Sequence, residues 1–242
     1  MTALTLAVAE TRLILRNRTV LVTAAILPIA MAFLVGRSNL GGMSEAGGAL
    51  AAVQLSMLLV FGVLMTSTMT LAARRQQRYL KRLRSSPVST ASIVAGLTGP
   101  LVLVVAVQAL IVLASTAWES GAAPVHPELL VLAFATGAAT SVALGFLTAS
   151  FTKSPEAAQI TVLPGTLVFM AGTALGLFPF EGVRSVLVAA VPGAGMAELT
   201  RLAWDGSPEG HAAAVEPLLL STAVAVVAIV IAARLFRWQP RP

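Results

Sequence analysis

Six of the 16 Lys and Arg residues gather in one short stretch, the basic segment (residues 74–87). It contains no acid, and its basic residues are Arg74, Arg75, Arg78, Lys81, Arg82 and Arg84. Clustered cations can bind anionic lipid headgroups, at about 1 kcal/mol per residue near a membrane surface, or dock a partner protein. Tyr79, Leu80 and Leu83 recur at helical spacing, which favours a short docking helix. Pro87 would end that helix. The residue pattern alone leaves anchoring and docking equally open.

The residue types that catalysis would need do not form a known pattern. No Lys follows a Gly anywhere in the chain, so the phosphate-binding loop that ends in Gly-Lys-Ser or Gly-Lys-Thr cannot form. His126 and His211 fall in predicted loops, without a His-Glu-x-x-His pattern or a serine nucleophile elbow. Cysteine is absent, which excludes disulfides and thiol chemistry. We therefore expect no catalytic residue, no metal site and no cofactor in this chain itself.

The composition indicates a lipid bilayer as the surroundings of this chain. Of the 242 residues, 57% are hydrophobic and 11% are charged, whereas soluble domains have about 25% charged residues. In a soluble protein, a net charge of +6 would suggest binding to nucleic acid. In a membrane protein, clustered cations are first explained by their role in setting the orientation of the chain in the bilayer. We therefore expect no nucleic-acid partner.

Six apolar windows predict membrane-spanning helices, which need about 20 residues each. They cover approximately 20–35, 49–73, 93–117, 129–151, 157–178 and 217–234. Pro28 interrupts the first window, and a charged stretch of almost twenty residues precedes it. We therefore expect a retained span and not a signal peptide. The predicted fold is an all-α polytopic membrane protein with six transmembrane helices, forming one domain over residues 1–242.

The Lys and Arg residues are divided unevenly between the two sides of this topology. Arg37, Arg184 and Arg201 fall on one side, and the remaining Lys and Arg residues, the basic segment included, fall on the other. Loops rich in Lys and Arg stay in the cytoplasm. We therefore expect the basic segment and both termini to be cytoplasmic.

The residues before the first window predict a helix that lies along the membrane. Residues 2–18 place most of their apolar side chains on one helical face. The charged residues of this stretch are Glu10, Arg12, Arg16 and Arg18. We expect an interfacial helix on the cytoplasmic surface.

The stretch before the last window is too short to span a membrane. Residues 178–206 are interrupted by Pro192, Gly193 and Gly195. Irregular backbone at membrane depth must be covered by protein, so we expect a re-entrant pair of short outer helices over about 181–204. An outer loop with one amphipathic helix is the alternative.

Small residues recur every four positions in two windows. Gly137, Ser141 and Gly145 lie in the fourth window, and Gly172 and Gly176 lie in the fifth. This spacing lets helices approach closely. The partner helix could belong to the same chain or to a second subunit.

The energy for any transport must come from outside this chain. None of the six windows has an ionisable residue near its midpoint, and ion-coupled carriers and proton pumps depend on such residues. A partner that hydrolyses ATP in the cytoplasm is the candidate source.

The basic segment resembles a cytoplasmic stretch in the permease subunits of type-2 ATP-binding-cassette (ABC) exporters, a group that includes daunorubicin-type drug exporters and polysaccharide and lipid exporters. That stretch commonly reads Arg-Glu-x-Gly-Thr-Leu-x-Arg-Leu-x-x-Thr-Pro-Leu-Ser. The residues that match it are Arg75, Leu80, Arg82, Leu83, Pro87 and Ser89. Gln76 stands where the family commonly has an acid, and Arg78-Tyr79 replaces Gly-Thr. Residues 10–18, Pro28 and residues 191–201 are similar to the family's interfacial helix, first span and outer re-entrant pair.

The resemblance implies a permease half in a bacterial inner (plasma) membrane. It implies pairing with a second permease chain, identical or related, and with separate ATPase subunits that hold ATP and Mg. The helix that docks on the ATPase would comprise Arg75, Arg78, Tyr79, Leu80, Lys81, Arg82, Leu83, Arg84 and Pro87. The cargo expected is an apolar small molecule, a drug or an antibiotic, moved out of the cytoplasm.

A pathway between two such chains would be lined by the first, second and fifth spans. The adaptable apolar residues there are Phe33, Met57, Phe61, Met65, Phe169 and Met170. Ordinary helix packing is the alternative role for each. Two rival functions remain, namely export of a lipid or glycan, and a scaffold or sensor subunit that transports nothing.

Overall fold

The computed structural model of the chain describes residues 26–38, 47–77, 79, 89–178 and 183–236. These residues form helices joined by turns and loops, without a strand. Five of the described helices are long and apolar enough to cross a membrane, and a sixth apolar helix is shorter. The all-α polytopic fold is therefore confirmed. The predicted interfacial helix at 2–18 lies outside the described residues.

The helices follow the predicted windows closely. In chain order they are α3 (Leu27–Arg37), α4 (Gly47–Met57), η3 (Leu58–Met65), α5 (Thr66–Gln76), α7 (Thr90–Ser120), α8 (Pro127–Phe151), α9 (Pro155–Thr161), α10 (Leu163–Gly176), α11 (Val183–Ala189), α12 (Ala194–Asp205) and α13 (Ala212–Leu235). The first window, 20–35, is described only as α3, in which Pro28 occupies the first turn. A full first span at this position stays a prediction.

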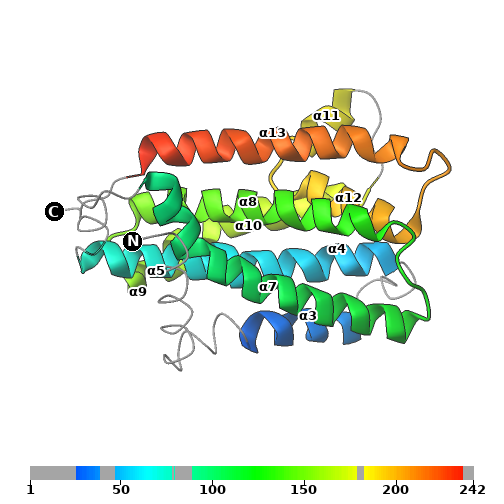
Figure 1. The fold of residues 1–242 in the computed structure, drawn as a ribbon, viewed down its shortest axis with the longest axis horizontal. Helices are drawn as coiled ribbons and strands as arrows, with labels where there is room; N and C mark the ends of the chain where they lie inside the picture. Colours follow the sequence, from blue (N-terminus) through cyan, green and yellow to red (C-terminus); the bar gives the residue numbers. More distant parts are fainter. Residues whose placement is uncertain (1–25, 39–46, 78, 80–88, 179–182, 237–242) are drawn as a thin grey trace.

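The long helices lie side by side and give the molecule two distinct ends (Figure 1). We call the end where α5 finishes and α7 begins the basic end, because Arg74, Arg75, Lys153 and Arg234 lie at helix ends there. The opposite end, where α8 and α13 begin, carries Glu119, Glu128, Asp205, Glu209 and Glu216 and is called the acidic end.

The second span contains a π-helical centre. The eight residues of η3 join α4 to α5 in one continuous helix. The hydroxyl of Thr66 donates to the carbonyl of Phe61, five residues back, at 3.0 Å. Gly62 lies so close to α7 that an added Cβ would come 2.5 Å from Val105 Cγ2. Widened turns of this kind are rare and frequently occur at functional sites.

Both stripes of small residues pack within the chain. A Cβ on Gly137 would come 2.6 Å from Leu59 Cδ1, and one on Gly145 would collide with the hydroxyl of Ser67. On α10, a Cβ at Gly172 would come 2.9 Å from the carbonyl carbon of Pro192. The two stripes therefore let η3, α5 and the start of α12 approach α8 and α10 within one subunit.

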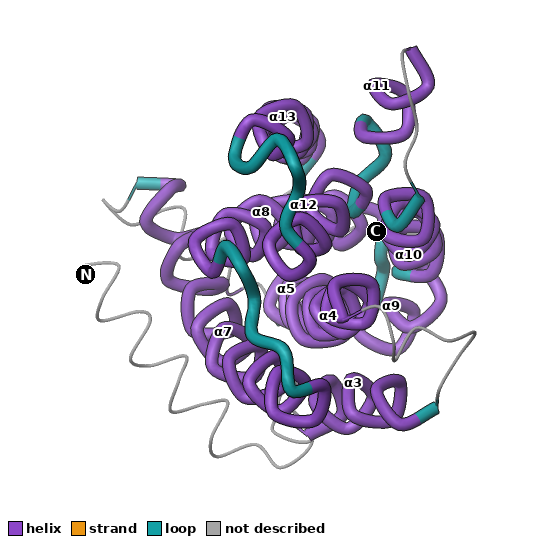
Figure 2. The backbone as a smooth tube through the Cα atoms, turned by 90° about the vertical axis from the view of Figure 1, so that its right-hand side faces the viewer, coloured by secondary structure: helices purple, strands orange, loops and turns teal. Residues whose placement is uncertain are grey.

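Helix α12 is buried within the bundle at the acidic end. Nine of its 12 residues are buried, and it packs against α4, α8, α10 and α13, as Figure 2 shows. The chain enters it through Gly193, whose φ of +98° favours glycine. Two short helices, α11 and α12, thus stand where the sequence predicts a short helix pair. Their depth in a bilayer stays a prediction.

A buried glutamine links three helices near the acidic end. Gln54 of α4 is 2% exposed. Its amide nitrogen donates to the carbonyl of Ala32 in α3 at 3.3 Å. Its amide oxygen accepts from the hydroxyl of Thr116 in α7 at 2.8 Å. These bonds satisfy a polar side chain among apolar neighbours and position the short helix α3.

Candidate functional site

Arg75, at the start of the basic segment, is buried. Its side chain lies at the end of α5 and is 2% exposed. The guanidinium donates to the carbonyl of Ser150, at 3.4 Å, and to that of Thr152. The last carbonyls of a helix lack partners within that helix and form the negative end of its dipole. Arg75 therefore caps the C-terminus of α8.

The corner between α8 and α9 is held by a set of short polar contacts beside this arginine cap. The hydroxyls of Thr152 and Thr161 are 2.7 Å apart. Ser154 accepts from the backbone N–H of Ala157 at 3.2 Å, and Pro155 occupies the first turn of α9. A side-chain cap and an N-terminal proline are both favourable at a helix start. The basic segment thus begins at a well-packed junction of three helices.

Of the predicted docking residues, the structure describes Arg75 and Tyr79. The guanidinium of Arg75 faces α8 and serves the packing of the chain, so a docking role for this side chain stays a prediction. Tyr79 is half-buried against a core cluster that includes Phe146. The guanidinium carbon of Arg74 lies 5.1 Å from the Tyr79 ring centroid, a cation–π distance. The remaining docking residues, Arg78, Leu80, Lys81, Arg82, Leu83, Arg84 and Pro87, lie outside the described part of the chain.

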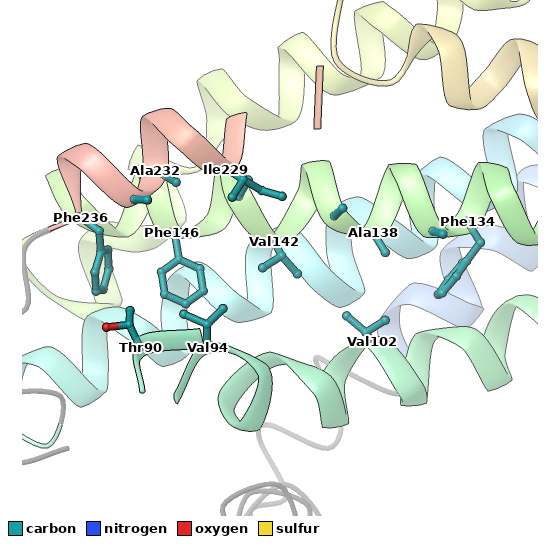
Figure 3. Close-up of a pocket in the computed structure, with 14 residues that line it drawn as sticks. Thr90, Val94, Val102, Phe134, Ala138, Val142, Phe146, Ile229, Ala232 and Phe236 are labelled. Carbon is teal, nitrogen blue, oxygen red and sulfur yellow. The ribbon is translucent and has the colours of Figure 1, made fainter. Parts of the chain in front are cut away.

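An apolar groove of about 540 Å³ runs between α7, α8 and α13 (Figure 3). Pockets for small ligands usually measure about 300–1,000 Å³. Thr90, the first residue of α7, supplies the one polar side chain among the lining residues. At the basic end the groove is bordered by Phe146 and Phe236, whose rings meet edge to face with centroids 4.9 Å apart. The groove therefore complements an apolar molecule.

The groove exists because two facing helices present small side chains. On α8 these are Ala135, Ala138, Ala139 and Ala143, and on α13 they are Ala232 and Ala233. Helix α8 packs closely against α13 but makes little contact with α7, and these methyl groups leave the space between the three helices unfilled. Among the described residues, no charged side chain lines the groove. The alanine pattern is visible in the sequence, but only the pairing of α8 with α13 turns it into a groove.

The predicted pathway residues lie elsewhere. None of the six lines the groove. Phe169 is completely buried in the main core, and Phe33 and Met170 pack against that core from partly exposed positions. Met57, Phe61 and Met65 are partly buried along the second span. A pathway role for each of the six residues stays a prediction.

A third group of polar side chains lies at the acidic end. Both histidines of the chain, His126 and His211, meet there beside Glu128. They are far apart in the sequence, and only the juxtaposition of α8 with α13 unites them. This arrangement was not expected from the sequence, which placed the two histidines in separate loops.

The comparison with protein families bears on the first five predicted spans. The model of the ABC-2 type transporter family matches residues 2–173, more than half of the chain. This range includes the basic segment and extends from the predicted interfacial helix into α10. No curated protein matches the chain. With an all-helical membrane fold and this match, the chain belongs to the ABC-2 type transporter family and is the permease component of an ABC transporter.

Proposed function

We propose that this permease belongs to an ATP-driven exporter that moves an apolar small molecule, a drug or an antibiotic, out of a bacterial cytoplasm. The proposal is supported by the family match and by the resemblance of the basic segment to the ATPase-docking stretch of such exporters. The observation that carries it is the buried contact of Arg75 with the end of α8. Through this contact the basic segment is connected directly to the spanning helices.

In this proposal the ATPase acts on the permease through the basic segment. The positive charges of Arg78, Lys81, Arg82 and Arg84 attract the partner, while Leu80 and Leu83 fill its cleft. Movement of this segment pulls on α5, which continues through η3 into α4 as one helix. The Arg75 cap transmits the same movement to the corner between α8 and α9, because a buried charge cannot leave its partners without a large penalty. Two permease chains and two ATPase subunits, which hold ATP and Mg, complete the exporter.

The groove between α7, α8 and α13 supports the choice of cargo. The part of its lining that the structure describes has one hydroxyl, that of Thr90, and no charge. A glycan would leave many hydroxyl groups without hydrogen-bond partners in such a lining, which is costly. An acyl chain is as complementary to it as an apolar drug. Lipid export is therefore the second candidate function.

Charge reversal in the basic segment tests the proposed coupling. We expect a variant with Arg78→Glu, Arg82→Glu and Arg84→Glu to lose co-purification of the ATPase and to lose transport. The physical reason is that the introduced negative charges would repel the surface of the ATPase that the arginines of the parent attract. Pull-down from native membranes, followed by identification of the bound proteins, measures the first effect.

The control variant reverses Arg37 and Arg184, which the topology places on the other side of the membrane. It should retain the partner. If the triple variant retained both the ATPase and transport, docking at the basic segment would be excluded. If the parent protein captured a kinase or regulator and not an ATPase, the scaffold or sensor function would replace export.

A further inference from the structure

We propose that His126, Glu128 and His211 form a binding site for a divalent transition-metal ion, with zinc as the best match. Each of the three offers one ligand atom, and these atoms all lie within 4.8 Å of one another at the acidic end. The site is independent of the groove and of the basic segment, and it does not depend on the proposed export function.

The distances within the cluster suit a metal ion. Oε1 of Glu128 lies 2.7 Å from Nε2 of His211 and 3.3 Å from Nδ1 of His126. The two imidazole rings are 4.3 Å apart between centroids and inclined by 60°. Zinc ligands at about 2.0–2.2 Å from a tetrahedral ion are separated by roughly 3.3–3.5 Å. Small side-chain rotations would therefore bring all three atoms onto one ion.

The backbone holds the two histidines in corresponding positions. His126 immediately precedes α8, and His211 immediately precedes α13. At both positions the side chain makes no capping hydrogen bond to its own helix. Residues that usually occupy such positions, Ser, Thr, Asp and Asn, cap the helix. Here the two imidazoles point to each other and to Glu128 in the first turn of α8.

The loop before α8 is fixed against α12. The backbone N–H of His126 donates to the carbonyl of Ala203 at 2.8 Å, and that of Val125 donates to the carbonyl of Trp204 at 3.4 Å. His126 is thus held in place, with 20% of its side chain exposed, while the side chains of His211 and Glu128 are 64% and 53% exposed. An ion can reach the cluster from solvent.

The ligand set selects among metals. Two imidazole nitrogens and one carboxylate oxygen match zinc, with a fourth position left for water. Copper(II) and nickel(II) also favour imidazole, whereas calcium and magnesium require a shell of oxygen atoms. Without an ion, His211 and Glu128 form a surface hydrogen bond with His126 beside them, which is the competing explanation.

Zinc in this site would connect elements that are distant in the sequence. It would join the start of α8 to the start of α13 across the loop 206–211 that leaves α12. Occupancy is therefore expected to restrain the acidic end of α13 and to raise the thermal stability of the protein, because the ion binds the folded arrangement and not the unfolded chain.

Titration with zinc of the full-length protein in detergent micelles tests the proposal. The chain has two histidines and no cysteine, so a purification tag without histidine leaves this cluster as its only source of imidazole ligands. We expect one zinc ion per chain by calorimetry and an increase in the unfolding temperature with zinc but not with magnesium. His211→Ala and His126→Ala should each weaken zinc binding by more than about tenfold.

The matched control is Glu209→Gln, which removes an acidic charge from the same loop without touching the cluster. It should bind zinc as the parent does, whereas Glu128→Gln should bind more weakly. Copper(II) provides a second readout, since its electron paramagnetic resonance spectrum should show coupling to two imidazole nitrogens. Absence of saturable zinc binding, or equal binding by the His211→Ala variant, would overturn the site. Binding without an increase in unfolding temperature would overturn the connection between α8 and α13.

Discussion

At the scale of single residues, Arg75 differs most from what its neighbourhood in the sequence suggests. It lies in a run of cations that resembles a docking segment, yet its guanidinium is buried against the last carbonyls of α8. The sequence pattern could identify the run but could not show that Arg75 turns inward. That separation depends on where α8 ends in space.

Replacing Arg75 by Ala should destabilise the purified protein. The change leaves carbonyls of Ser150 and Thr152 without their donor, and hydrogen bonds of a charged group are worth about 1.5–3 kcal/mol. Thermal unfolding of the chain alone in detergent measures the loss. The control is Gln76→Ala, an exposed neighbour on the same helix end, which should leave stability unchanged. Equal stability of the two variants would show that the cap contributes nothing.

The contribution of Glu198, in α12 at the acidic end, to the stability of the fold is expected to depend on pH. Burial raises the pKa of its carboxyl group from the ordinary 4.5, the charge of Glu216 raises it further, and the charge of Arg201 acts in the opposite direction. A carboxyl group with a raised pKa stabilises the fold while it is protonated, and this contribution is lost as the pH rises through the pKa of the folded state.

The Glu198→Gln variant should therefore be more stable than the parent at neutral pH and equally stable at acid pH. Glutamine keeps the shape of the side chain without the charge at this partly buried position. Unfolding temperatures measured in detergent from about pH 4 to about pH 8 would reveal the difference. A stability gap that does not change with pH would contradict the burial argument.

At the scale of elements, the helices themselves were accessible from the sequence. Hydropathy predicted the window 129–151, and α8 spans Pro127–Phe151. Helix α7 begins earlier than its predicted window, 93–117. The side chain of Ser89 accepts from the backbone N–H of Ser92 and thereby caps the start of α7 at Thr90. The stripes of small residues predicted close approach without naming a partner. The structure assigns them to contacts within the chain, above all with α12.

A Gly172→Ala substitution should displace α12. The added methyl group would meet backbone atoms of Pro192, which cannot rotate away as a side chain could. Overpacking of this kind costs about 1–3 kcal/mol, more than the gain in helix propensity from Gly to Ala, about 1 kcal/mol. A lower unfolding temperature is therefore expected. The control is Gly99→Ala, where a new Cβ meets nothing within 4 Å, and which should be neutral or stabilising.

At the scale of the whole molecule, the function proposed here requires two regions to act together. The basic segment would receive the movement of the ATPase, and the groove between α7, α8 and α13 would accept the cargo. Thr90 of the groove begins α7 three residues after the basic segment ends in the sequence. In the proposed function, movement of the basic segment would therefore reach α7 and the groove that α7 helps to line.

Filling the groove should abolish transport without affecting assembly. Ala139→Phe places a ring among the lining residues of α8. We expect cells with this variant to become as susceptible to apolar antibiotics as a deletion strain, while the ATPase still co-purifies. Ala174→Phe on the exposed side of α10 is the control and should retain export. Undiminished export by Ala139→Phe combined with Ala233→Phe would remove the groove from the pathway.

The sequence by itself determined the properties that depend on local composition. Mean apolarity over each window predicted the spans, helical spacing predicted the helices, and the cations of residues 74–87 with their neighbours indicated the transporter family. Tertiary structure alone decided which distant residues meet. The cap of Arg75 on α8, the groove between α7, α8 and α13 and the cluster of both histidines with Glu128 each join residues from separate helices. Helical periodicity says which face a residue occupies, but the neighbour of that face is set by the packing of the complete bundle.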